Sequence, residues 1–331
     1  MKKIIFVDPG TKAPLSYTEK DGIIEYSSSQ SRDKYLCVNG INDFIFPKHL
    51  SPTDNEVSSH YDNRAEAYEA NLHLTFKTHY LDEVTCRNGF IDLLGIEENH
   101  RVMEIACGTG RDSVLIADRL AGKGELHLAD ISKEMLMICQ KKIVAKPIDS
   151  YLCLANAANL PYPDNYFDST YSFGGLGEFS EIAKSLAEMV RVTKTGGKIV
   201  VGDESMPPWL RGTYFSNVLS TTNPQFLAPL PLNEMPAEAR NVHLRWVIGG
   251  TFYLIDFEVG EGEPTANFDF EIPGIRGGTY RTRYEGQLEG VRRETKELAN
   301  RAIKASKTSM HDWLDRVVRE AAEKDLGHTE D

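Results

Sequence analysis

Four residues in the first half of the chain have the types and spacing of a nucleoside-binding site. Gly108 follows Glu104 by four positions, Gly110 comes two positions later, and Asp130 stands twenty residues beyond the second glycine. Glycines at a strand-to-helix turn let the backbone approach a ligand closely, and an acid about this far downstream accepts hydrogen bonds from ribose hydroxyls. The spacing predicts an adenine nucleoside held by a doubly wound sheet.

The residues around this turn argue against a dinucleotide or a nucleoside triphosphate. A dinucleotide fingerprint has a third glycine where this chain has Ser113, and no lysine follows the loop as in a Walker motif. Glu104 would repel a phosphate but can pair with an ammonium group. A ligand with an adenosine end and a cationic amino-acid end satisfies both conditions. S-adenosylmethionine is such a ligand.

Four ordered segments resemble motifs of class I S-adenosylmethionine-dependent methyltransferases of the small-molecule, UbiE-like type. Residues 104–110, 130–136 and 156–168 are similar to the first three motifs, and residues 191–201 are similar to the turn into the fifth strand. The resemblance covers residues 56–205. It implies S-adenosylmethionine as cofactor and a cofactor site made of Glu104, Ala106, Gly108, Gly110, Asp130, Ile131, Met135, Asn156, Ala157, Phe173 and Tyr68.

The same resemblance implies roles for several of these side chains. Met135 is expected to flank the adenine, and residues 156–157 are expected to meet its edge. Residues 56–72 resemble a lid helix, in which Tyr61 or Tyr68 would close over the bound cofactor. The alternative is that both tyrosines pack on the sheet.

The acceptor side is expected in the loops after the fourth and fifth strands. Glu178 lies in the glycine-rich segment 173–179 and could act as a base or as the partner of a cation, and residues 203–205 (Asp203, Glu204, Ser205) follow the fifth strand. Glu178, Asp203 and Tyr61 form the catalytic candidates, whereas His60 and His79 are weaker ones. The implied reaction is an in-line displacement in a closed site, and an amine or alcohol acceptor would need a base. The acceptor atom, whether O, N, S or C, stays open, although the acids favour a cationic or amine acceptor.

The pattern of elements predicts how these residues are positioned. Strands and helices alternate between residues 101 and 202, which is typical of a parallel sheet with helices on both faces. We therefore expect an α/β fold: a Rossmann-like, seven-stranded methyltransferase sheet with a small β-rich amino-terminal module and extra carboxy-terminal helices. A helix is expected at 236–248, and an antiparallel pair is expected from strands 251–259 and 267–272.

Three regions follow from this pattern. Residues 1–50 form the β-rich module, residues 51–286 form the methyltransferase domain, and residues 287–331 form a helical extension. Within the second region, the insertion 206–235 is expected to act as a substrate lid. The carboxy-terminal helices are expected to pack on the outside or to pair with a second subunit as a homodimer.

The amino-terminal module carries a second resemblance. Its end, residues 35–47, is similar to the end of the zinc-ribbon domain that precedes some rRNA guanine methyltransferases. That domain would carry four metal-binding cysteines, and here only Cys37 is present, so no zinc or other metal is expected. The module is expected to pack against the domain or to cover the mouth of the active site.

The composition of the chain limits which partners and which cellular compartment are expected. The formal net charge is −12 and the pI is about 5.3, which disfavours nucleic acid as a partner. No continuous apolar segment approaches the ~18 residues of a membrane span. The apolar segment at the start of the chain is too short for a signal peptide. The five cysteines form no Cys-x-x-Cys pair, which favours a reducing compartment. We expect a soluble cytoplasmic enzyme of small-molecule metabolism with no membrane partner.

Three other functions stay open at this point. An enzyme of the same fold could transfer or cyclise the aminocarboxypropyl chain of S-adenosylmethionine and release methylthioadenosine. An RNA methyltransferase is suggested only by the amino-terminal module. A non-enzymatic nucleoside-binding protein is disfavoured because Glu104, Gly108, Gly110 and Asp130 are all present.

Overall fold

The computed structural model describes residues 6–273, 277–285 and 291–327, and divides the chain into two compact units. The first unit is Met1–Pro264 and the second is Thr265–Asp331. The boundary expected at residue 287 therefore falls inside the second unit. Within the described residues, no helix is long and apolar enough to cross a membrane.

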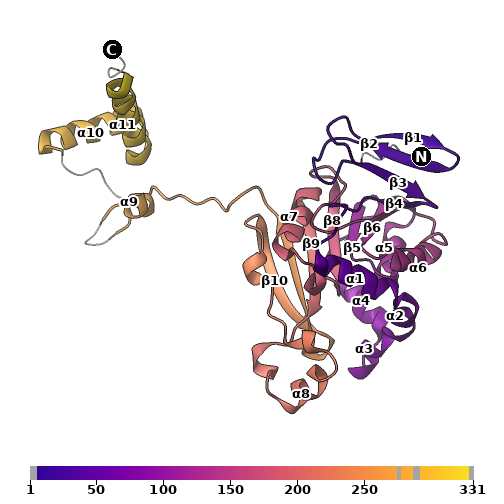
Figure 1. Cartoon of the computed structure of the whole chain (residues 1–331). Coiled ribbons are helices and arrows are strands. Elements are labelled where there is room, and N and C mark those ends of the chain that lie inside the picture. Colours follow the sequence, from indigo (N-terminus) through magenta and orange to yellow (C-terminus); the bar gives the residue numbers. More distant parts are fainter. Residues whose placement is uncertain (1–5, 274–276, 286–290, 328–331) are drawn as a thin grey trace. The chain divides into compact units, whose positions relative to one another are not determined.

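One large sheet runs through the first unit (Figure 1). Its eleven strands have the order β1-β2-β3-β4-β7-β6-β5-β8-β9-β11-β10, and the pairs from β4 to β9 are parallel. The α/β fold class is confirmed. The seven strands of the expected methyltransferase sheet are β7 (Asp149–Leu154), β6 (Glu125–Asp130), β5 (Arg101–Ile105), β8 (Phe167–Phe173), β9 (Thr193–Glu204), β11 (Phe252–Val259) and β10 (Ala239–Val247).

The sequence predicts a separate amino-terminal module, but the strands of this module extend the main sheet. Strand β4 pairs with β7 in parallel register, and the side chain of Asn42 donates a hydrogen bond of 2.9 Å to the carbonyl of Leu152. Without β4, strand β7 would present unpaired backbone groups at the sheet edge, which proteins usually cover. The sequence pattern also predicts a strand at residues 2–7, which lie largely outside the described residues. The four added strands are β1 (Ser16–Lys20), β2 (Ile23–Ser27), β3 (Lys34–Val38) and β4 (Ile41–Asp43).

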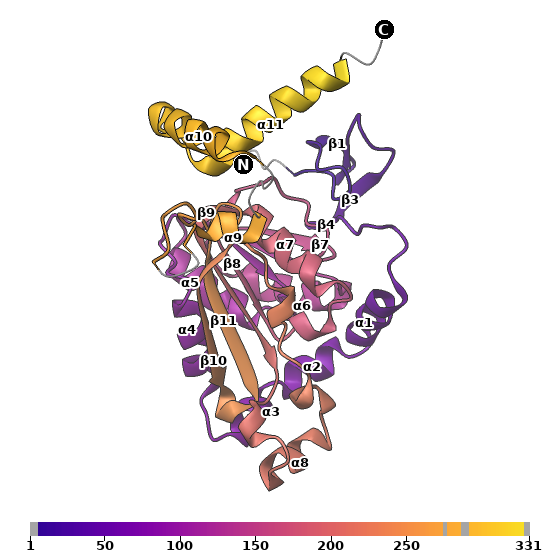
Figure 2. The same ribbon diagram turned by 90° about the vertical axis from the view of Figure 1, so that its left-hand side faces the viewer.

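Helices cover both faces of the sheet because side chains alternate along each strand. Val102 belongs to a core cluster with residues of α4, α5 and α6, whereas its neighbour Met103 belongs to a second cluster with residues of α7. Figure 2 shows the same layers from the side. The bounds of these helices are α4 (Glu83–Asp92), α5 (Arg111–Leu120), α6 (Lys133–Ile143) and α7 (Ile182–Val192).

The expected lid helix is divided into shorter helices. Ser51 caps the first of them by accepting a hydrogen bond of 3.0 Å from the backbone N–H of Asp54, as is usual for serine at that position. The helical hydrogen bonding is interrupted at Asn63 and Arg64, where one helix ends and the next begins. The three helices are α1 (Pro52–Asp62), α2 (Ala65–Asn71) and α3 (His73–Thr78).

The segment between β9 and β11 differs from two expectations. The helix expected at 236–248 is wrong, because Ala239–Val247 is strand β10, and β11 pairs with β10 and β9. Residues 267–272 form no strand, so the expected pair with β11 is wrong as well. The insertion before β10 contains four short helices, η2 (Pro208–Leu210), α8 (Tyr214–Ser220), η3 (Pro224–Leu227) and η4 (Leu232–Glu234), and a further one, η5 (Ile248–Gly250), joins β10 to β11.

The described part of the second unit contains three helices, and its residues 265–273 form no helix or strand. Helices α10 and α11 contact each other, and neither contains a buried residue. These two helices match the positions expected for the carboxy-terminal extension. The elements are α9 (Tyr280–Glu285), α10 (Arg293–Ser306) and α11 (Met310–Gly327).

Candidate active site

The glycine turn after β5 has the backbone conformation that its residue types suggest. Ala106, Gly108 and Gly110 all have positive φ, at 54°, 53° and 81°. A Cβ at Gly108 would meet no atom within 4 Å, so this position borders free space. A Cβ at Gly110 would lie 2.6 Å from the Sγ of Cys139, so here the missing side chain lets the loop and α6 pack together. The two glycines therefore have different roles.

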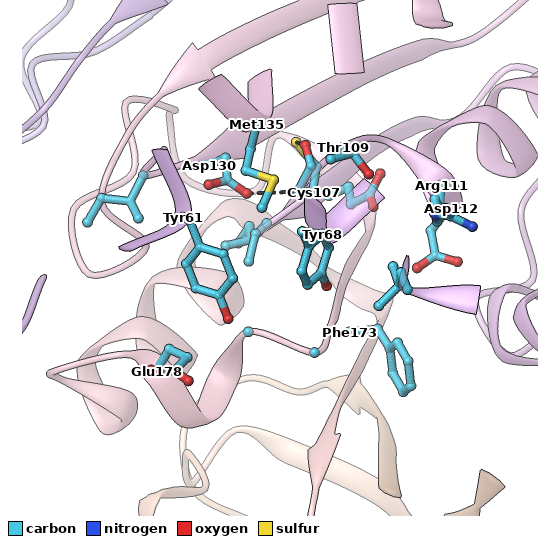
Figure 3. A pocket seen from close by; sticks show the side chains of 18 of the residues that line it. Tyr61, Tyr68, Cys107, Thr109, Arg111, Asp112, Asp130, Met135, Phe173 and Glu178 are labelled. Atoms are coloured by element: carbon cyan, nitrogen blue, oxygen red, sulfur yellow. Dashed lines mark hydrogen bonds between the residues drawn. The ribbon is translucent and has the colours of Figure 1, made fainter. Parts of the chain in front are cut away.

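A cavity of about 420 Å³ lies where β5, β6 and β8 end, which is the expected place for a ligand in an open α/β sheet. Figure 3 shows side chains from several elements around the same space. Gly110 and Asp203 are not among its lining residues. The other predicted site residues all line it: Tyr61, Tyr68, Glu104, Ala106, Gly108, Asp130, Ile131, Met135, Asn156, Ala157, Phe173 and Glu178.

Asp130 is held at the end of β6 by two backbone groups. The N–H of Gly108 donates to Oδ2 over 2.7 Å, and the N–H of Ser132 donates to Oδ1 over 2.9 Å. Each carboxylate oxygen has a further lone pair, so both can still accept a hydroxyl donor. Burial raises the pKa of Asp130 to about 6. The carboxylate thus fixes the glycine loop and faces the cavity at the same time.

Glu104 is a buried carboxyl, 3% exposed, at the cavity wall. Ser113 donates a hydrogen bond of 2.5 Å to its Oε2, which gives the serine at the place of the third glycine a defined contact. Burial, followed by the charge of Asp112, raises the pKa of Glu104 well above its usual value. Asp112 is paired with Arg87 over 2.6 Å, and both are buried. Arg87 also pairs with Glu83 over 2.8 Å, whereas Glu104 forms no ion pair with another described residue, so the site favours a cationic ligand group beside Glu104.

The lid tyrosines meet above the cavity. The ring centroids of Tyr61 and Tyr68 are 5.8 Å apart with planes at 87°, an edge-to-face contact, and both rings line the cavity. Burial raises the pKa of each phenol, so both remain neutral hydrogen-bond donors at physiological pH. In Figure 3 Tyr61 lies on the same side of the cavity as Glu178.

Helix α2 is attached to the glycine loop by Glu69. The hydroxyl of Thr109 donates to Oε2 of Glu69 over 2.5 Å, and Arg111 and Lys142 form ion pairs with the same carboxylate at 3.3 Å and 2.8 Å. Arg111 also donates to the backbone carbonyl of Glu69. These contacts hold Tyr68, one residue earlier, over the cavity.

Asn156 lies in the wall between β7 and α1. Its side-chain oxygen accepts from the N–H of Ala158 over 2.9 Å, and its amide donates to Oδ2 of Asp54 over 3.2 Å. Asp54, which sequence reasoning missed, is buried, lines the cavity and also accepts from Ser180 over 2.9 Å. The only sequence signal at Asp54 was its place in the first turn of α1, which is also a common place for a surface acid.

The acidic side chains after β8 and β9 divide between two places. Glu178 and Glu204 line the cavity, whereas Asp203 is buried behind the loop and borders a second, small pocket with them. Asp203 accepts from the backbone N–H groups of Gly177 and Glu204 over 2.6 Å and 2.8 Å. Among the residues that the structure describes, no lysine or arginine forms an ion pair with these three acids. Glu204, not Asp203, is the residue of this turn that faces the main cavity.

The environment of these acids changes their proton affinity. Burial, with smaller contributions from Asp203, raises the pKa of Glu178, and burial together with a hydrogen bond to Asp203 raises the pKa of Glu204 well above its usual value. A carboxyl with a raised pKa is a stronger base once it is ionised. The acceptor end of the cavity therefore offers two candidate proton acceptors.

Comparison with known proteins places this geometry in a family. The model of the ubiE/COQ5 methyltransferase family matches residues 50–219, just over half of the chain, and this span contains the cavity-lining loops after β5, β6 and β8. The chain belongs to the ubiE/COQ5 methyltransferase family. Membership confirms the resemblance to class I methyltransferases, whose cofactor is S-adenosylmethionine.

Curated relatives of this family match the chain over a limited length. A protein from Cupriavidus necator named "Ubiquinone/menaquinone biosynthesis C-methyltransferase UbiE" is 32% identical over 145 residues, which is 44% of this chain and 56% of that protein. A protein of the same name from Burkholderia cenocepacia is 31% identical over 154 residues, 46% of this chain and 59% of that protein. The chain thus spans between half and two thirds of the length of these relatives.

Solved structures with a similar arrangement include two methyltransferases. One is a geranyl diphosphate C-methyltransferase from Streptomyces coelicolor, with a TM-score of 0.47, 11% identity, and coverage of 64% of this chain and 100% of that one. The other is a phosphoethanolamine N-methyltransferase from Haemonchus contortus, with a TM-score of 0.47 and 11% identity. The match covers 65% of this chain and 62% of that one.

Proposed function

We propose that this chain transfers the methyl group of S-adenosylmethionine to a small-molecule acceptor bound in the same cavity. The observation that carries the proposal is the cavity at the ends of β5, β6 and β8, which brings Glu104, Gly108 and Asp130 to one wall. Membership of the ubiE/COQ5 methyltransferase family supports the same conclusion.

The chemistry of this wall fits the cofactor. Asp130 offers free lone pairs to a pair of hydroxyls, and Gly108 leaves space in which a ribose can approach the backbone. Arg87 is paired with Asp112 and Glu83, and Glu104 forms no ion pair with another described residue, so the Glu104 carboxyl suits an ammonium group. We assign the nucleoside end to Asp130 and the amino-acid end to Glu104.

When bound, the cofactor supplies an electrophilic methyl carbon on a sulfonium. The chain itself must orient the acceptor, exclude water and take up a proton where the acceptor loses one. Tyr61, Tyr68 and Phe173 line the cavity and supply apolar walls, and Glu178 and Glu204 supply carboxylates for the proton. Catalytic roles for Glu178 and Tyr61 are part of this proposal, and we place Asp203 behind Glu204 as its positioning residue.

We propose a carbon atom of a hydroquinone as the first acceptor to test. The Cupriavidus and Burkholderia relatives are named as C-methyltransferases of ubiquinone and menaquinone biosynthesis. Carbon becomes nucleophilic when a neighbouring phenolic hydroxyl loses its proton, which Glu178 or Glu204 can accept.

The test is a product analysis. The chain is incubated with S-adenosylmethionine and a reduced, prenylated naphthohydroquinone, and the products are separated by mass spectrometry. Formation of S-adenosylhomocysteine together with a methylated ring supports the proposal. Methylthioadenosine in place of S-adenosylhomocysteine would show transfer or cyclisation of the aminocarboxypropyl chain, and no conversion with this probe would remove hydroquinones as the acceptor class.

A further inference from the structure

Three carboxyl groups lie around one small pocket at the acceptor end of the cavity, and the proposed function leaves open which of them takes the proton of the acceptor. Asp203 and Glu204 end strand β9, and Glu178 ends the short helix η1 (Leu176–Glu178) in the loop after β8. All three border the same pocket of about 40 Å³, and Glu178 and Glu204 also line the main cavity. The charge of each carboxyl therefore affects the proton affinity of the others.

The backbone fixes the position of Asp203. Its Oδ2 accepts from the N–H of Gly177 over 2.6 Å, and its Oδ1 accepts from the N–H of Glu204 over 2.8 Å. The residue is only 4% exposed, and a Cβ at Gly177 would lie 3.3 Å from its Oδ2, so η1 packs directly against this carboxyl. Hydrogen bonds from two backbone N–H groups stabilise the ionised form, so Asp203 is the member of the three that is built to carry negative charge.

Glu204 is held in its protonated form by this neighbour. Burial, followed by a hydrogen bond that its carboxyl donates to Asp203, raises the pKa of Glu204 well above its usual value. Among the residues that the structure describes, no lysine or arginine pairs with either carboxyl, so no cation offsets a second charge beside Asp203. Two carboxyls in such contact hold one proton between them.

Glu178 differs from Glu204 because no hydrogen bond holds its proton. Burial, followed by the charge of Asp203, raises the pKa of Glu178, and no hydrogen bond contributes to this shift. Both oxygens of the Glu178 carboxyl can therefore accept a donor in the cavity that they line. Its raised pKa also makes the ionised carboxylate a stronger base than a solvated glutamate.

The other ionisable groups near the acids leave this division unchanged. Burial raises the pKa of each of the three nearby tyrosines, so they stay neutral at physiological pH. The one nearby imidazole is exposed, and it lowers the pKa of Glu178 less than Asp203 raises it. One further acid acts on the tyrosine of β11. These groups are Tyr61 and His60 of α1, Tyr68 of α2, Tyr253 of β11 and Glu234 of η4.

We propose that Glu178 is the base that takes the proton of the acceptor, and that Glu204 keeps its own proton in a hydrogen bond to Asp203. Glu178 is then the catalytic residue of the three. Asp203 is a positioning residue, because its charge holds the proton of Glu204 and strengthens Glu178 as a base. This inference rests on the proposed function, since it concerns the proton that the acceptor loses.

The proton and the electrons balance for a hydroquinone acceptor. The hydroxyl proton passes to a carboxylate oxygen of Glu178, and the electron pair of the broken O–H bond makes the ring carbon nucleophilic. The bond from that carbon to the methyl group forms as the sulfur–methyl bond breaks, and the electron pair of the broken bond stays on sulfur. The ring carbon then loses its hydrogen as a proton, which restores the hydroxyl. One proton, held by Glu178, is released to water.

The first test needs no acceptor. Infrared spectra of the full chain at pH 7.5 are compared with those of Glu204→Gln and Glu178→Gln, because protonated and ionised carboxyls absorb at different frequencies. We expect Glu204→Gln to lose a protonated carboxyl and Glu178→Gln to lose an ionised one. Glu181→Gln is the control for an ordinary ionised acid, since Glu181 is exposed and pairs with Lys184 over 3.5 Å. Should Glu204→Gln not fold, Asp203→Asn replaces it, and its spectrum should lose the protonated carboxyl at a lower pH than the native chain.

The second test measures kcat between pH 5 and pH 8 with the reduced, prenylated naphthohydroquinone. S-adenosylmethionine is saturating, so that the ionisation of Asp130 does not limit the rate. We expect the native rate to rise with pH as Glu178 ionises. Glu178→Gln should be at least a hundredfold slower and lack this rise, whereas Glu204→Gln should lose less than tenfold and keep it. Asp203→Asn should show the rise at lower pH, because the charge that raises the pKa of Glu178 is gone. Glu181→Gln should match the native chain.

Two results would overturn the inference. One is an ionised Glu204 in the infrared spectrum at pH 7.5, and the other is a greater loss of rate in Glu204→Gln than in Glu178→Gln. A native chain that does not methylate the naphthohydroquinone contradicts the proposed acceptor alone. The infrared spectra then decide whether Glu204 or Glu178 holds the proton.

Discussion

Asp130 combines a structural and a binding role in one carboxylate. It accepts hydrogen bonds from the backbone N–H groups of Gly108 and Ser132, and it faces the cavity with the remaining lone pairs. Its pKa, raised to about 6 by burial, means that its charge changes within a range accessible to experiment. Both the stability of the fold and the binding of a ribose should therefore depend on pH through this residue.

Cofactor affinity should fall at mildly acid pH. Ribose hydroxyls donate to the ionised carboxylate, and with a pKa of about 6 only about a tenth of Asp130 is ionised at pH 5. We expect S-adenosylhomocysteine to bind roughly tenfold more weakly at pH 5 than at pH 7.5, as measured by calorimetry. Asp130→Asn should bind weakly at both pH values, so an equal pH dependence in this variant would assign the effect to another group.

The same shift has the opposite effect on stability. The folded chain holds the Asp130 proton more tightly than the unfolded chain does, since burial raises the pKa from 3.8 to about 6. This residue therefore favours folding at acid pH, and that contribution is lost as the pH rises from about 4 to about 6. Asp130→Asn removes the dependence, which urea unfolding at several pH values would measure.

Gly110 is expected to be a packing position. Gly110→Ala would place a Cβ 2.6 Å from the Sγ and 3.2 Å from the Cα of Cys139, in addition to the strain of a positive φ. We expect a loss of about 2 kcal/mol or more in the free energy of unfolding, measured with urea. Gly196→Ala is the matched control, because Gly196 has φ +80° and an added Cβ there would meet no atom within 4 Å. Equal losses in the two variants would show that strain alone, without the contact to α6, accounts for the effect.

Sequence reasoning found the residues of the site that belong to local motifs. Glu104, Gly108 and Asp130 lie at strand ends, and their spacing along the chain reflects a local strand-turn-helix geometry. Asp54 lines the same cavity, but no short-range pattern marks it as a site residue. It reaches the cavity through packing between distant elements, and that packing is set by the core as a whole.

At the scale of elements, α2 is held by its ion pairs. Burial raises the pKa of Glu69, but hydrogen bonds from Lys142 and Thr109 outweigh burial and lower it overall. The ionised carboxylate therefore favours the closed position of α2 over the glycine loop. Because Tyr68 precedes Glu69, the ion pairs and hydrogen bonds of Glu69 also fix the Tyr68 side chain in the cavity wall.

Weakening the contacts of Glu69 should increase amide hydrogen exchange in the backbone of α2. Glu69→Gln removes the ion pairs with Arg111 and Lys142, and we expect amide hydrogen exchange in Ala65–Asn71 to be roughly threefold faster. Glu66→Gln is the control, since Glu66 is exposed on the same helix. If both variants exchange at the native rate, the three contacts of Glu69 do not hold the helix.

The parallel sheet with helices on both faces could be predicted, whereas one antiparallel pair could not. Val242, Leu244 and Trp246 alternate with polar residues, which is the period of a half-buried strand, and the helix expected at 236–248 overlooked this signal. Residues 267–272 show a similar alternation, but β9 and β10 already occupy both sides of β11. Periodicity identifies a strand, but only the completed sheet decides whether a pairing position remains.

At the scale of the whole molecule, the first unit contains the complete cavity. Every residue that lines it lies between Asp54 and Phe252, and the second unit begins at Thr265. We expect a chain ending at Pro264 to bind S-adenosylhomocysteine within about twofold of the full chain, since it keeps all of these residues. A loss of more than tenfold in calorimetry would show that the second unit contributes to the site.

The proposed role of α10 and α11 in a homodimer is tested by the same pair of chains. These helices contain no buried residue, so they have apolar surface available for a partner. We expect the full chain to sediment as a dimer and the shortened chain as a monomer. Two monomers, or two dimers, would contradict a contact through these helices.

The central claim is that the wall formed by β5 and β6 holds an adenosyl ligand through Asp130. The most direct measurement is a calorimetric titration of S-adenosylhomocysteine into the native chain, into Asp130→Ala and into Asp118→Ala, a surface acid that pairs with Lys146 over 2.6 Å. We expect saturable binding by the native chain and the Asp118 variant, and at least tenfold weaker binding, about 1.4 kcal/mol, for Asp130→Ala. No binding by the native chain, or equal affinity in all three, would contradict it.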